Sequence, residues 1–337
     1  MLTMACVGST NFLGCLPKDA FAVVPVGQNA LKCRNWEDIR AVCGRSPDIV
    51  AYFDYSAPPP LPGVEHFPCL TVFGCVDSHI HHWYPTYAQA FDLCTVSLRD
   101  HLPAFQENLS PDRAIWLPPA AEAVAAEALP REEDKDIDLL FVGKVDAELT
   151  PGRAALLRQL AALFPGLVVT RGSWRELFPR ARLVLNIAEH GDLNFRVFEA
   201  LSVGSCLLTP EVGHGLTELF TPGEHLFTYP PTDLDGLAAM IRELLPDPAR
   251  RQRVARQGLE ALRARHSPAA RAERFAGFIA AQPAQALVRR RLVATPELPA
   301  SLRLLYLHWA EALPGDPRAG LYLEAAKGRL PAGLGGL

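Results

Sequence analysis

Short apolar runs alternate with polar, helix-compatible stretches through the first third of the chain. Continuous apolar runs separated by helical stretches are typical of a parallel sheet that is covered on both faces. The runs that predict buried strands are residues 21–26, 48–55, 69–74, 91–97 and 114–117. A proline-rich stretch at residues 57–68 predicts an irregular connection inside this half of the protein.

A second series of the same kind follows residues 120–136, where the composition shifts to Ala, Glu and Asp and predicts a linker. The expected strands are residues 138–143, 167–170, 183–188 and 206–209, and the expected helices are 153–164 and 194–203. Amphipathic helices are predicted at 234–245, 248–265 and 269–280, with helix-like segments near 302–312 and 321–328. Two successive series of this type predict an α/β protein with two doubly wound, Rossmann-like domains. We expect domains at 1–130 and 131–282, followed by a helical extension at 283–337.

Composition narrows the class of protein. The 337 residues are 49% hydrophobic and 21% charged, with a formal net charge of −4, so the chain lacks the basic stripe of a nucleic-acid-binding protein. No apolar run approaches the ~20 residues of a membrane span, and no basic segment precedes an apolar leader. Seven of the eight cysteines fall in the first 94 residues without a Cys-x-x-Cys pair, which favours reduced, buried thiols. We therefore expect a cytoplasmic protein without a nucleic-acid partner or membrane span.

The segment from residue 185 to residue 229 carries the strongest chemical signal. A buried strand leads into a polar loop, and a helix is predicted to begin near Asn194. Its first N–H groups lack partners within the helix and form a natural seat for a diphosphate. Arg196 in the first turn can add a charge-assisted contact, and Glu199 one turn later can accept the two hydroxyls of a ribose. The alternative for this pair is a plain surface ion pair at helical spacing.

This segment resembles a known family. The pattern NFRxFEALxxGxxLLT from Asn194, followed by ELFxxGEHLxxY from Glu218, is similar to the C-terminal half of CgeB-like (spore maturation protein-like) glycosyltransferases. These are relatives of the GT-B glycosyltransferases with a family 1/4-type C-terminal domain. The segment DLLFVGKV from Asp138, and DSHIH from Asp77, also resemble parts of that family. The resemblance covers roughly residues 69–278.

The resemblance implies a fold and an activity. The fold is two Rossmann-like (GT-B) domains with a cleft between them, followed by the short helical extension. The activity is transfer of a sugar from a nucleotide-diphosphate sugar to a protein or cell-surface glycan acceptor. Relatives of this type use no bound metal, and the nucleotide sugar is a donor substrate, so no separate cofactor is expected.

The resemblance also assigns residues to the donor. Glu199 matches the ribose-binding glutamate, while Gly143, Lys144 and Arg153 match the loop that approaches the phosphates. Gly191 stands where the wider group carries a second, sugar-contacting glutamate. Lys144 and Arg153 fit a solvated surface position equally well.

Two further residues have open interpretations. Trp174, after a predicted strand, is suited to stacking on a nucleobase, but a core tryptophan is the commoner outcome. His214 lies between two glycines that permit close backbone approach to a sugar or phosphate, or that simply form a turn.

The first half offers candidates for the catalytic base. Asp77 and His79 follow a predicted parallel strand, where open α/β sheets place ligands, and either can deprotonate an acceptor hydroxyl. A helix-capping aspartate and a loop histidine are an equal alternative. His79 and His81 also fit the His-x-His pair of metal-dependent amidohydrolases, which predicts a closed barrel with further ligands on later strands.

Three functions follow from these observations. A glycosyltransferase is the principal prediction, and a catalytically silent sugar-nucleotide-binding or assembly protein is the second, favoured by the glycine at position 191. A metal-dependent hydrolase that uses His79 and His81 is the third.

Overall fold

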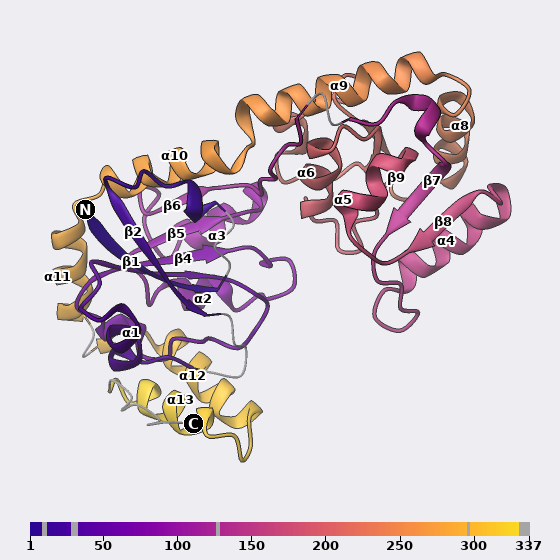
Figure 1. The fold of residues 1–337 in the computed structure, drawn as a ribbon. Coiled ribbons are helices and arrows are strands. Elements are labelled where there is room, and N and C mark those ends of the chain that lie inside the picture. The colour runs from indigo at the N-terminus through magenta and orange to yellow at the C-terminus, as the bar shows by residue number, and fades with distance from the viewer. Residues whose placement is uncertain (9–11, 28–32, 126–128, 295–296, 330–337) are drawn as a thin grey trace. The chain divides into compact units, whose positions relative to one another are not determined.

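The computed structural model describes residues 1–8, 12–27, 33–125, 129–294 and 297–329. The chain forms two compact units, the first made of residues 1–118 and 272–337 and the second of residues 119–271. Each unit is built around one open parallel sheet (Figure 1). The prediction of two Rossmann-like α/β domains is therefore confirmed.

The first unit contains the longer sheet. Its strand order is β2-β1-β3-β4-β5-β6. The strands are β1 Leu2–Gly8, β2 Phe21–Gly27, β3 Ile49–Phe53, β4 Leu70–Cys75, β5 Leu93–Val96 and β6 Ala114–Trp116. β1 was not predicted, although it pairs with both β2 and β3 and all its residues after Leu2 are buried. Its Met, Ala, Cys and Thr side chains carry a weaker strand signal than the Val- and Phe-rich runs elsewhere.

Helices cover both faces of this sheet. They are α1 Trp36–Cys43, α2 Tyr84–Ala88, α3 Leu102–Gln106, α10 Pro268–Ala280, α11 Ala284–Ala294, α12 Ala300–Ala312 and α13 Arg318–Ala326. Phe275 of α10 and Leu287 of α11 pack with one set of sheet residues, whereas Tyr306 of α12 and Tyr322 of α13 pack with another. The helices α11, α12 and α13 thus complete the core of the first unit.

The boundaries of the units differ from the predicted domains 1–130, 131–282 and 283–337. The predicted linker at 120–136 falls within the second unit, and the last helices fall within the first. The physical reason is that the apolar faces of the last helices are buried against a sheet formed by the start of the chain.

Arg291 of α11 is anchored deep in the first unit. Its guanidinium donates to both carboxylate oxygens of Asp92, at 3.0 and 3.1 Å. It also donates to backbone carbonyls of the segment before β4, those of Val64, Glu65, Phe67 and Cys69. Because Asp92 is fully buried, this charge requires a buried cationic partner. The contact fastens α11 to the first half of the chain.

The second unit has the strand order β11-β10-β9-β7-β8. Its strands are β7 Ile137–Val142, β8 Leu167–Thr170, β9 Ala181–Leu185, β10 Leu207–Pro210 and β11 Phe227–Tyr229. Its helices are α4 Pro151–Leu163, α5 Trp174–Leu177, α6 Phe195–Ser202, α7 Leu216–Leu219, α8 Leu234–Leu244 and α9 Pro248–Arg265. The chain runs from β7 to β8 on one side and then returns to β9 on the other. Such a reversal creates the crevice at which open α/β sheets bind ligands.

Both open sheets contradict the barrel that the metal-dependent hydrolase requires. Within the described ranges, no three His, Cys, Asp or Glu side chains gather in a group that would hold a metal ion. No described helix is long and apolar enough to cross a membrane.

Candidate donor-binding site

Several predicted site residues meet at one edge of the second sheet. The carboxyl ends of β7, β8 and β9 lead there into loops at residues 143–150, 171–173 and 186–194. The loops after β7 and β8, together with α5 and α6, line a pocket of about 370 Å³. It is lined by the predicted residues Gly143, Lys144, Trp174, Arg196 and Glu199, together with Val142, Arg171, Gly172 and Phe178.

Arg196 occupies the first turn of α6 and reaches back over β7. Its guanidinium lies 5.3 Å from the ring centroid of Phe141, and Nη1 donates to Oδ1 of Asn186 at 3.4 Å. A Cβ atom at Gly143 would lie only 3.1 Å from Nη2 of Arg196, so the glycine leaves room for this side chain. Burial lowers the pKa of Arg196, and the nearby Arg153 lowers it further. The partly buried guanidinium of Arg196 is therefore suited to binding an anion.

Arg153 contacts the same aromatic ring as Arg196. Its guanidinium is 5.7 Å from the centroid of Phe141 and donates to the carbonyl of Lys144 at 2.8 Å. It does not line the pocket of Arg196 but a neighbouring hollow of about 190 Å³. Two guanidinium groups on one ring repel each other, and a diphosphate between them would offset that repulsion.

Glu199 and Trp174 form the other side of the pocket. Burial raises the pKa of Glu199, and the charges of Arg196 and Arg175 lower it in part. Trp174 is half-buried, and the guanidinium of Arg175 lies 4.4 Å from its ring. Trp174 therefore lines the pocket and is not enclosed in the core, while Arg175 covers part of its ring.

Asn194 and His214 are predicted donor residues that do not line this pocket. Asn194 is the N-cap of α6 but makes no capping bond, and its Nδ2 donates to Asn186 at 3.2 Å. His214 lies between β10 and α7 with a φ of 58°, in the left-handed region. Lys144 is exposed, with Nζ 3.3 Å from a carboxylate oxygen of Asp146.

Asn186 is a structural centre of the site that sequence analysis missed. Its side chain accepts hydrogen bonds from Asn194 and Arg196 and donates to Thr209 at 2.9 Å. Its backbone carbonyl accepts the hydroxyl of Tyr229 at 2.6 Å. The available signal was a lone amide inside the apolar run LVLNIA, because a buried polar side chain requires partners.

The first unit holds Asp77 and His79 in the loop after β4. The loop is organised by Asp54, a buried carboxylate that sequence analysis did not single out. Asp54 accepts the backbone N–H groups of Val76 and Asp77 at 3.2 and 2.8 Å, and also the hydroxyl of Tyr84. Burial raises the pKa of Asp54, whereas these hydrogen bonds lower it.

Hydrogen bonds of neighbouring side chains hold the loop that contains Asp77 and His79. Asp77 accepts the hydroxyl of Ser56, and both Asp77 and His79 are half-buried. The neighbouring Ser78 is buried and its hydroxyl lies 2.9 Å from Nδ1 of His101. The loop is therefore held from two sides.

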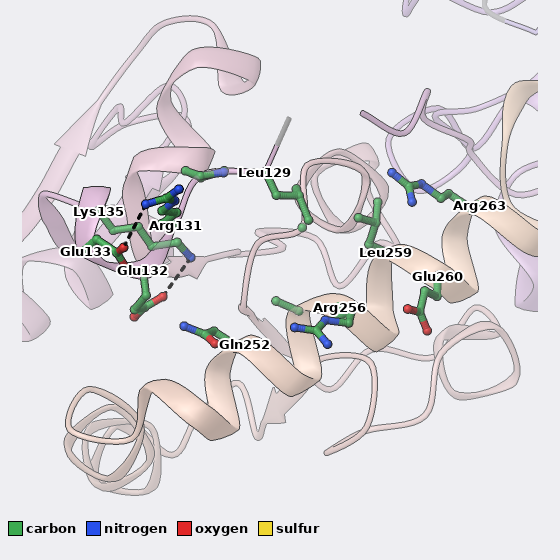
Figure 2. Close-up of a pocket in the computed structure, with 13 residues that line it drawn as sticks. Leu129, Arg131, Glu132, Glu133, Lys135, Gln252, Arg256, Leu259, Glu260 and Arg263 are labelled. Atoms are coloured by element: carbon green, nitrogen blue, oxygen red, sulfur yellow. Dashed lines mark ion pairs between the residues drawn. The ribbon is translucent and has the colours of Figure 1, made fainter. Parts of the chain in front are cut away.

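A different pocket of the second unit lies away from the predicted residues. It has a volume of about 510 Å³, and residues 129–135 and α9 line it (Figure 2). Its acidic and basic side chains largely pair with one another, as Lys135 does with Glu132 at 3.5 Å and Arg131 with Glu133 at 3.9 Å. This mixed lining is less suited to an anionic nucleotide than the pocket around Arg196.

Comparisons with known proteins bear on the family and the fold of the chain. Residues 122–277 match the family model described as glycosyl transferase-like. No curated protein sequence matches the chain. The CgeB-like subtype remains a prediction.

Solved structures with the same fold include a sucrose-phosphate synthase and a galactosyltransferase. The structure of Anabaena Alr3699/HepE in complex with UDP and glucose has a TM-score of 0.61 and 11% identity, over 84% of this chain and 100% of that chain. The sucrose-phosphate synthase of Thermosynechococcus elongatus has a TM-score of 0.57 and 12% identity, over 83% and 98%. The lipopolysaccharide outer core galactosyltransferase WaaB has a TM-score of 0.53 and 11% identity, over 82% and 99%.

At these identities, the structural likeness establishes the fold alone. Residues 122–277 match the glycosyl transferase-like family model, and the chain has the two-domain GT-B fold of these solved structures.

Proposed function

We propose that this protein transfers a hexose-type sugar from a nucleoside diphosphate sugar to a protein or cell-surface glycan, without a bound metal. The observation that carries the proposal is the pocket where Arg196, Lys144 and Glu199 meet the N-terminus of α6. Its charges and free helical N–H groups complement the diphosphate, and its carboxylate complements the ribose hydroxyls. The structure of HepE with UDP-glucose shows that the same fold holds such a donor.

In the proposed reaction, different residues take different roles. Arg196, Arg153 and the helix N-terminus would stabilise the negative charge that develops on the departing diphosphate, the role a metal ion takes in other enzymes. Trp174 would carry the nucleobase on its ring, and Asn194 and His214 would line the donor's approach. Asp77 or His79 would take the proton of the acceptor hydroxyl.

The first test is thermal stabilisation by a panel of UDP, GDP, ADP and their sugar conjugates, with and without a chelator. A ligand at about 100 times its dissociation constant adds about 2.7 kcal/mol to the free energy of unfolding, a readily measured shift. We expect one base to give a chelator-resistant shift that Glu199→Gln reduces and the exposed control Glu260→Gln preserves. No shift with any nucleotide would refute the donor site.

A binding protein without transferase activity is the second candidate. The observation that favours it is that Gly191 offers no carboxylate at the sugar-contacting position, while both oxygens of the nearby Glu189 accept backbone N–H groups. Release of free nucleoside diphosphate from the bound sugar nucleotide, with or without an acceptor, separates the two. An active transferase releases it, and a silent binder retains the intact donor.

A further inference from the structure

Glu189 joins two loops at the carboxyl edge of the second sheet. It follows β9, yet its Oε1 accepts the backbone N–H of Gly152 at 3.0 Å and its Oε2 accepts that of Arg153 at 2.8 Å. These are the first two residues of α4 that have an N–H group, because α4 begins with Pro151. Glu189 therefore caps a helix through two residues that lie 37 and 36 positions earlier in the chain.

The helix has no other side-chain cap. Thr150 occupies the N-cap position, but its hydroxyl donates to the carbonyl of Asp146 at 2.8 Å and accepts the N–H of Asp146 at 3.0 Å. Gly152 also fits the carboxylate, since a Cβ atom there would lie 3.2 Å from Oε1 of Glu189. A carboxylate at this end also interacts favourably with the helix dipole.

This cap sets the position of Arg153. The backbone N–H of Arg153 is held by Glu189, and its guanidinium is held by the carbonyl of Lys144 and the ring of Phe141. The same ring carries Arg196. These three contacts hold Arg153 at the ring that also carries Arg196 before any ligand arrives, which reduces the entropy that a ligand must remove on binding.

We infer that Glu189 is a positioning residue that presets Arg153 beside Arg196 for the diphosphate of the donor. The inference rests on the proposed function. It assigns Glu189 no contact with the donor sugar, because each of its carboxylate oxygens is engaged by α4. Glu189 acts through Arg153 and not on the substrate itself.

A double-mutant cycle tests this assignment. The variants are Glu189→Gln, which retains the size of the side chain, Arg153→Met, which retains an apolar stem over Phe141, and the double variant. The probe is whichever of UDP, GDP or ADP the wild type binds, measured by titration calorimetry. Glu260→Gln removes the same charge from an exposed position of α9 and serves as the matched control.

We expect Glu189→Gln to weaken nucleoside diphosphate binding about tenfold, the loss typical of one misplaced charged contact. It should cause no further loss when Arg153 is already replaced, because the two residues act as one unit. Binding of the corresponding nucleoside, which lacks phosphates, should change in neither variant. Glu189→Asp, whose carboxylate falls short of α4, should resemble Glu189→Gln in binding.

The inference about Glu189 and the proposed function are overturned by different results. An undiminished nucleoside diphosphate affinity in Glu189→Gln, with weaker binding of the sugar nucleotide alone, would make Glu189 a sugar contact and overturn the inference. Equal losses in the wild-type and Arg153→Met backgrounds would also overturn it. If the wild type binds no nucleotide at all, the proposed function itself fails, whatever the variants do.

Discussion

At the scale of single residues, Glu65 in the first unit is a buried acid whose neighbours do not fully offset the cost of burying its charge. It is 3% exposed, and burial raises its pKa to about 7, against the opposing effects of the Tyr306 hydroxyl and the Arg291 charge. His66 also faces it, with Nε2 3.9 Å from Oε1. The folded protein thus keeps a proton that the unfolded chain releases near the ordinary value of 4.5.

This difference predicts a pH dependence of stability. As the pH rises from about 4.5 to about 7, the unfolded state loses the proton of Glu65 first, so the free energy of unfolding falls, by up to about 3 kcal/mol. Glu65→Gln should therefore gain stability relative to the wild type between about pH 5 and about pH 8. Urea unfolding at both values measures this gain, with the exposed Glu107→Gln as control. A wild-type-to-variant difference that does not change with pH would contradict the prediction.

At the scale of elements, two glycines inside helices predict opposite effects of the same substitution. A Cβ atom on Gly258 of α9 would lie 2.4 Å from the carbonyl oxygen of His225 and 2.7 Å from Leu201 of α6. Gly277 of α10 has nothing within 4 Å of the same position.

Gly258→Ala should therefore destabilise the second unit by about 1–3 kcal/mol, because the two chain segments must separate. Gly277→Ala should instead stabilise the first unit by about 0.5–1 kcal/mol, the ordinary preference of a helix for alanine. Differential scanning calorimetry of both variants is the measurement. Equal shifts of the same sign would show that the packing of α6 against α9 does not decide the outcome.

The parts of the structure that sequence could predict are those determined by local patterns. The five later strands of the first sheet and the full extent of α9 follow from apolar runs and helical periodicity. Sequence analysis did not predict α11, because three consecutive arginines are typical of a solvated surface. The partner of Arg291 lies 199 residues away in the chain. Strand β9 ends at Leu185 rather than continuing to residue 188, and the side chain of Asn186 beyond it bonds Thr209 of β10, Asn194 and Arg196.

In the candidate site, too, local patterns could be predicted from sequence and contacts between distant positions could not. Arg196 and Glu199 could be chosen from sequence because a helix brings them to one pocket by local spacing. The bonds of Glu189 to α4 and of Asp54 to the Asp77 loop join positions 36 and 23 residues apart, and no local pattern marks such pairs.

At the scale of the whole molecule, one unit is continuous in sequence and the other is not. We expect a fragment of residues 119–271 to fold alone and to bind the same nucleoside diphosphate, because it contains the entire second sheet and the pocket around Arg196. A fragment of residues 1–118 should remain partly folded and bind a hydrophobic dye, until residues 272–337 are supplied. Circular dichroism and dye fluorescence measure both outcomes. Cooperative unfolding of residues 1–118 alone would contradict this prediction.

The anchoring of Arg291 has a consequence for synthesis on the ribosome. Translation at about 5–20 residues per second delivers the sheet of the first unit well before α11, with all of residues 119–271 made in between. During that interval the carboxylate of Asp92 and the carbonyls before β4 lack their guanidinium. The first half of the nascent chain therefore stays incompletely folded and accessible to chaperones and proteases during this interval. The second unit is made later but reaches its native form first.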